Sequence, residues 1–126
     1  MLKNIRHIGI ATDNLKKSLW FYKKVLGFKT KVQITEYGKI TDKLTNLKKI
    51  KIKTVKLKSR KSDVMIELLY FQKKKRKEKK NYNISRIGTS HFAITVNNLD
   101  KFYKSIKNKG ITFITKPLVS NDKKFK

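Results

Sequence analysis

The sequence predicts an α+β protein built from two copies of one module, in which a strand is followed by a helix and then by further strands. The main observation is a long internal repeat: HIGIATDNLKKSLWFYKKVLGF begins at His7, and HFAITVNNLDKFYKSIKNKGITF begins at His91. In both copies apolar residues first alternate and then recur at helical spacing. The period is longer than the roughly 20–50 residues of a solenoid repeat, so it indicates a duplicated module. His7 and His91 are the two histidines of the chain, one in each copy.

Length and composition exclude several classes of protein. With 126 residues the chain fits one domain with its own core. It has no cysteine, so disulfides, thiolate metal sites and a cysteine nucleophile are excluded, and a metal would need nitrogen and oxygen ligands. We find no stretch of about 18 apolar residues and no secretory h-region. We therefore expect a cytoplasmic protein without a membrane partner.

The net charge of +26 raises the alternative of a nucleic-acid-binding protein. Of the 34 basic residues, however, only four are arginine, the side chain that phosphate and base recognition favours. The lysines are spread over nearly all segments, which is typical of a solvated surface. We expect no specific nucleic-acid partner, and we interpret the dense run KKKRKEKK from Lys73 to Lys80 as a charged linker.

The first module begins with a strand over Ile5–Ala11, in which Ile8 and Ile10 share one face. His7 lies on the other face, between small neighbours. Asp13 or Asn14 then caps a helix, which Gly27 ends. The helix carries an apolar stripe made of Leu15, Leu19, Tyr22, Val25 and Leu26.

Three more strands are expected to complete this module. Thr30–Glu36 is the first, with Val32 and Ile34 expected to face inward. A turn at Gly38 and a weakly helical segment with Ile40, Leu44 and Leu47 follow. In the second, Ile50–Leu57, apolar residues alternate with lysines. The apolar residues move from even to odd positions between Ile52 and Val55, and this shift of the apolar phase suggests a bulge. Val64–Phe71 is the most apolar run in the chain.

Glu67 lies in the middle of this apolar run and needs an explanation. An ionised carboxylate is costly to bury alone, so Glu67 is turned to solvent, paired with a cationic side chain, or bound to a metal ion. The alternative to a metal ligand is a carboxylate on an edge strand, paired with a nearby lysine. Alternation places Glu67 on one face with Met65, Leu69 and Phe71, which is not the composition of a solvent-facing surface.

The second module repeats the start of the first. Phe92, Ile94 and Val96 alternate with His91, Ala93 and Thr95, which predicts a strand. Asn98 caps a helix that Gly110 ends, and a further strand is expected near Ile111–Thr115. In both copies the bulky face packs on the helix, so both histidines are expected on the opposite face.

The chain resembles the vicinal oxygen chelate superfamily, and glyoxalase I-like members in particular. The resemblance covers nearly the whole chain and is specific for the superfamily rather than for one member. It is carried by HIGIA from His7, NL from Asn14, FY from Phe21, LGF from Leu26, IEL from Ile66, SHFAITV from Ser90 and NLD from Asn98.

The resemblance implies paired βαβββ modules that form a cupped mixed sheet around a divalent metal ion, which could be Zn, Ni, Fe, Co or Mn. His7, Glu67 and His91 match three of the four ligand positions. The closing glutamate has no counterpart after Pro117, so we expect a second module that is incomplete at its C-terminus. The expected organisation is one domain over residues 1–126: module one at 1–71, a basic linker at 72–83 and a partial module two at 84–126.

The function that the resemblance implies is that of a metal-dependent lyase or isomerase of the glyoxalase type. It would act on a small 2-oxo compound or its thiol adduct through bidentate chelation, with Glu67 as the base. The alternatives are a non-catalytic binding or resistance-type protein or a truncated paralogue, and an acyl-CoA epimerase or a dioxygenase. We also expect a homodimer, because the incomplete module would leave a sheet edge to cover.

Overall fold

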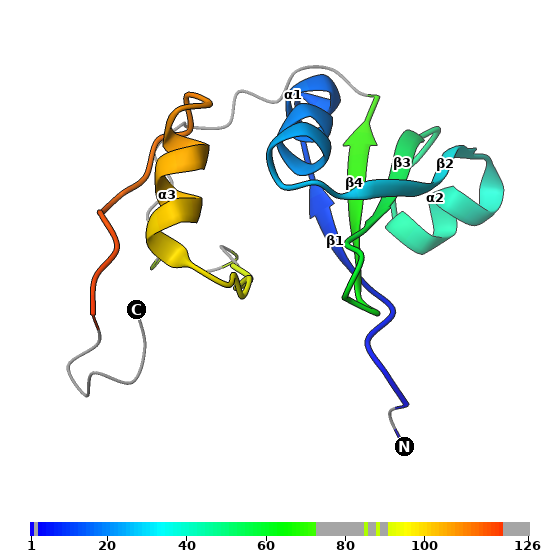
Figure 1. Ribbon diagram of the computed structural model, residues 1–126. Helices are drawn as coiled ribbons and strands as arrows, with labels where there is room; N and C mark the ends of the chain where they lie inside the picture. The colour runs from blue at the N-terminus through cyan, green and yellow to red at the C-terminus, as the bar shows by residue number, and fades with distance from the viewer. Residues whose placement is uncertain (2, 73–84, 86–87, 89–90, 120–126) are drawn as a thin grey trace. The chain divides into compact units, whose positions relative to one another are not determined.

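A computed structural model describes residues 1, 3–72, 85, 88 and 91–119 of the chain (Figure 1). The chain divides into two compact units, Met1–Arg76 and Lys77–Lys126, and each is described by itself. Apart from Gln72, the expected linker at 72–83 lies outside the described residues. Residues 120–126, at the end of the segment that follows Pro117, also lie outside them.

The first unit contains a four-stranded sheet with the order β1-β4-β3-β2. Its strands are β1 (His7–Ala11), β2 (Lys29–Tyr37), β3 (Lys51–Lys58) and β4 (Met65–Phe71). β1 runs parallel to β4, whereas β3 is antiparallel to both β4 and β2. The sheet is therefore mixed, and the α+β class is confirmed.

The helices of this unit are α1 (Leu15–Leu19), which continues into the π-helix η1 (Trp20–Val25), and α2 (Lys39–Thr45). Asn14 is the N-cap: its side-chain oxygen accepts a hydrogen bond from Lys17 N at 2.9 Å, which satisfies one of the free amides of the first turn. Gly27 ends the helical segment with φ at +77°, a conformation that glycine adopts without strain.

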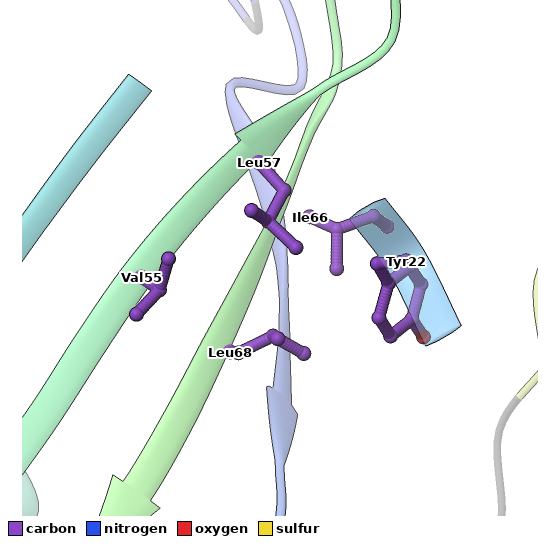
Figure 2. Close-up of a cluster of buried hydrophobic side chains, with 5 residues drawn as sticks. All are labelled: Tyr22, Val55, Leu57, Ile66 and Leu68. Atoms are coloured by element: carbon purple, nitrogen blue, oxygen red, sulfur yellow. The ribbon is translucent and has the colours of Figure 1, made fainter. Parts of the chain in front are cut away.

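The core lies between the α1–η1 segment and one face of the sheet. Its centre is made of Tyr22 from η1 and four strand residues, Val55, Leu57, Ile66 and Leu68 (Figure 2). The stripe residues Leu15, Leu19 and Leu26 pack against this cluster, together with Ile10 of β1. The predicted apolar stripe of the helix is thus buried or partly buried. The inward positions predicted for Ile8 of β1 and for Val32 and Ile34 of β2 are wrong, because these three side chains are exposed. Burial also raises the pKa of the Tyr22 phenol.

The bulge predicted in the third strand is wrong. β3 pairs with β4 without interruption from Ile52 to Leu57, and the register shift of the sheet lies in β2, between Thr30 and Val32. The apolar phase changes because β3 is buried on both faces. Ile52 and Thr54 are buried on one side, and Val55 and Leu57 on the other.

The second unit contains α3 (Leu99–Lys107), capped by Asn98, whose side chain accepts from Lys101 N at 2.9 Å. The predicted helix is therefore confirmed. The two predicted strands around it are wrong, because residues 91–96 and 111–115 form no strand in the described part of the unit. A strand needs a hydrogen-bonded neighbour. In the second of these segments Phe113 instead packs on Tyr103 of α3, with ring centroids 4.7 Å apart.

No helix within the described ranges is long and apolar enough to cross a membrane.

Candidate functional site

The first unit brings His7 and Glu67 together. β1 and β4 are parallel neighbours in which His7 lies beside Met65 and Gly9 beside Glu67. Both side chains occupy the face of the sheet opposite the core, which we call the histidine face. The strand register places on this face His7 of β1, Ile52, Thr54 and Lys56 of β3, and Met65, Glu67, Leu69 and Phe71 of β4. His7 Nε2 and Glu67 Oε2 are 3.2 Å apart.

Gly9 leaves room for this pair. A β-carbon at Gly9 would lie 3.4 Å from Leu69 Cδ1 and 3.9 Å from Glu67 Oε2. A methyl group would thus fill the space beside the carboxylate, and a longer side chain would displace it. The small residue between His7 and Ala11 keeps the Glu67 carboxylate accessible from β1.

Lys56 contacts the other oxygen of the same carboxylate, with 3.3 Å between Nζ and Glu67 Oε1. The contact follows from the register, which places Lys56 of β3 directly opposite Glu67. The side chain of Glu67 is 13% exposed and that of Lys56 21%. Of the three explanations for Glu67, pairing with a cationic side chain is therefore the one observed. Glu67 does not lie on an edge strand, because β4 is between β1 and β3.

A second carboxylate lies further along the sheet. Glu36 of β2 accepts a hydrogen bond from the hydroxyl of Thr54, a buried residue of β3 that shares the histidine face with Lys56. Sequence reasoning identified neither Lys56 nor Glu36. The alternation of β3 could have placed Lys56 on this face, but only with the β3–β4 register known.

The His7–Glu67 distance can be tested against the geometry of a metal site. Two ligands at about 2.05 Å from one ion are about 3.3 Å apart at a tetrahedral angle and about 2.9 Å apart at a right angle. The observed 3.2 Å lies between these values. The other ring nitrogen of His7, Nδ1, is buried and finds no hydrogen-bond partner among the described residues. An imidazole and a carboxylate so placed fit two ligands of Zn, Ni, Fe, Co or Mn.

The third predicted ligand belongs to the second unit. His91 is exposed there and precedes α3. Within the described ranges, no three His, Cys, Asp or Glu side chains come together to hold a metal ion. The structure thus groups His7 with Glu67, while a common site with His91 stays a prediction.

Comparison with known proteins decides the family. The family model of the glyoxalase/bleomycin resistance protein/dioxygenase superfamily matches residues 4–119. The chain belongs to this superfamily. The matched range includes His7, Glu67 and His91.

Solved structures show that the chain has the glyoxalase fold. A glyoxalase family protein from Bacillus cereus is 13% identical, with a TM-score of 0.67 over 95% of this chain and 83% of that one. The trypanothione-dependent glyoxalase I of Leishmania major is 19% identical, with a TM-score of 0.53 over 86% and 68%. At these identities the likeness extends to the fold alone. No curated protein matches this sequence closely enough to count as a relative.

Proposed function

We propose that this member of the glyoxalase superfamily is a metal-dependent lyase or isomerase that acts on a small 2-oxo compound or its thiol adduct. The observation that carries the proposal is the approach of His7 Nε2 to Glu67 Oε2, 3.2 Å apart on the face of the sheet away from the core. Two donors at ligand spacing, placed by neighbouring strands, support a divalent metal ion as the cofactor.

Each residue of the site has a separate role in this proposal. His7 and Glu67 would hold the ion, and His91 is the proposed third ligand. When bound, the metal supplies Lewis-acid stabilisation to adjacent substrate oxygens. Glu67 would take the proton next to the substrate carbonyl, since it is the carboxylate beside the proposed metal ligand His7. Met65 and Leu69, both partly buried, flank Glu67 on β4 and limit its access to water.

Metal binding tests this proposal directly. Freshly purified full-length protein is analysed for bound divalent metals and titrated with Zn²⁺ and Ni²⁺, and the isomerisation of the methylglyoxal–glutathione hemithioacetal is followed by ultraviolet absorbance. His7→Ala and Glu67→Gln are expected to weaken metal binding at least tenfold each and to abolish turnover. Asp63→Asn is the matched control, because this carboxylate is fully exposed and pairs with Lys58. Absence of metal from the wild type, in both purification and titration, would refute the proposal.

A non-catalytic binding protein is the second candidate, and the contact between Lys56 and Glu67 favours it. The ammonium group at 3.3 Å already neutralises the carboxylate without a metal ion. This candidate predicts that small-molecule binding is unaffected by EDTA, whereas the metal-dependent enzyme loses binding on chelation. Should a metal be bound without hemithioacetal turnover, substrate-dependent proton exchange would indicate an epimerase and oxygen consumption a dioxygenase.

We further propose that the protein acts in the cytoplasm as a homodimer. Sedimentation analysis of the full-length chain tests the dimer, and a monomer at micromolar concentration would contradict it.

A further inference from the structure

We infer that Lys56 is a substrate-binding residue that makes the site selective for anionic 2-oxo compounds, such as 2-oxo carboxylates. The inference rests on the proposed function, because it concerns the substrate of the same site. It begins from position: Lys56 and Glu67 are opposite each other in the β3–β4 register, and 3.3 Å separates Nζ from Oε1. A ligand anion in contact with Lys56 would therefore lie beside the carboxylate proposed to hold the metal.

Burial distinguishes Lys56 from another lysine of the same strand. Lys53 is exposed and lies opposite Tyr70 on the core side of the sheet. There both residues line a hollow beside Leu15 and Leu19 of α1. The side chain of Lys56 is 21% exposed. A partly buried ammonium group has lost much of its hydration, so its attraction to a ligand anion is less reduced by water and salt than that of a surface lysine.

The charges of the site favour an anion once a metal is present. Without metal, the positive charge of Lys56 balances the negative charge of Glu67. With a divalent ion bound, the ion and Lys56 together carry three positive charges and Glu67 carries one negative charge. Two positive charges then stay unbalanced, and neutral His7 adds none. A carboxylate adjacent to the substrate carbonyl would offset part of this excess. It would also supply the second oxygen of a chelating pair.

The neighbours of Glu67 indicate the rest of the substrate. Met65, Leu69 and Phe71 alternate along β4 on the histidine face and are all partly buried. They present apolar surface beside the ion pair of Lys56 and Glu67. The class that fits is a small anionic 2-oxo compound with an apolar body.

A matched acid and ester test this inference. Binding of 4-methyl-2-oxopentanoate and of its methyl ester to the Zn-loaded full-length protein is measured by calorimetry. The wild type is expected to prefer the acid, and Lys56→Met to reduce the acid-to-ester affinity ratio at least tenfold. Lys56→Arg should keep the preference, and Lys53→Met, on the opposite face of β3, should not change it. Lys56→Gln serves as a second neutral variant, with folding checked by circular dichroism.

Zn²⁺ affinity gives an independent readout. Removing the competing cation in Lys56→Met or Lys56→Gln should raise Zn²⁺ affinity several-fold, whereas a lysine with only a structural role would lower stability and leave both affinities unchanged. An acid-to-ester affinity ratio that stays within twofold of the wild-type ratio in both neutral variants would overturn this inference but not the proposed function. A wild type that binds Zn²⁺ but shows no preference for the acid would do the same. A wild type that binds no metal would overturn the proposed function as well.

Discussion

The ion pair between Lys56 and Glu67 should be energetically coupled well above the level of a surface salt bridge. At 3.3 Å the Coulomb attraction is about 1.3 kcal/mol at the dielectric constant of water and about 5 kcal/mol at an effective value of 20. The pair lies between these limits, because its side chains are 21% and 13% exposed. Desolvation offsets part of the gain, so we expect a coupling free energy of about 1.5–3 kcal/mol.

A double-mutant cycle measures this coupling. Lys56→Met, Glu67→Gln and the double variant are unfolded in urea without metal, and the coupling is the departure of their unfolding free energies from additivity. The first unit offers its own comparison in the Lys58–Asp63 pair, which is 3.5 Å apart with Asp63 fully exposed. Its coupling should be indistinguishable from zero.

Salt separates the two pairs further. Raising the ionic strength to about 1 M shortens the screening length to about 3 Å, which should leave most of the Lys56–Glu67 coupling intact, since partly buried charges are screened less. A Lys56–Glu67 coupling below about 0.5 kcal/mol would contradict the reasoning. Lys56 would then behave as an ordinary surface lysine.

Three further predictions concern the scaffold of the site. Gly9→Ala should leave stability unchanged or raise it by up to about 1 kcal/mol, whereas Gly9→Leu should displace Glu67 and abolish Zn²⁺ binding; calorimetry of both variants checks this. Tyr22→Ala should cost about 3–5 kcal/mol of unfolding free energy in urea, because it empties the centre of the core. Asp42→Ala should cost about 2 kcal/mol in the same assay, because the Asp42 carboxylate accepts from the backbone amides of Lys49 and Ile50, at 2.8 and 3.0 Å.

Local patterns allowed much of the first unit to be predicted. The strand β1, the caps at Asn14 and Asn98 and the stop at Gly27 depend on neighbours within a few residues, and each is found as expected. The π-helix from Trp20 to Val25 was not predicted, since WFYKKV fits an α-helical stripe equally well.

The missed parts depend on contacts between distant segments. Residues 91–96 have the alternation of a strand, but alternation alone does not supply the neighbour that a strand requires. The grouping of His7 with Glu67 was predicted through the resemblance to the superfamily, because it depends on the pairing of β1 with β4, which no local pattern supplies. Lys56 was not, because one lysine among many in a chain of net charge +26 has nothing in its local sequence to distinguish it.

The misinterpreted phase shift in β3 marks the site itself. On the histidine face β3 presents Ile52, then Thr54 and Lys56, while its core face gains the buried pair Val55 and Leu57. The apolar phase moves to the core face at the point where the histidine face becomes polar. This is where Thr54 donates to Glu36 and Lys56 contacts Glu67. In β3 the switch of apolar phase therefore coincides with polar contacts on the face that carries His7.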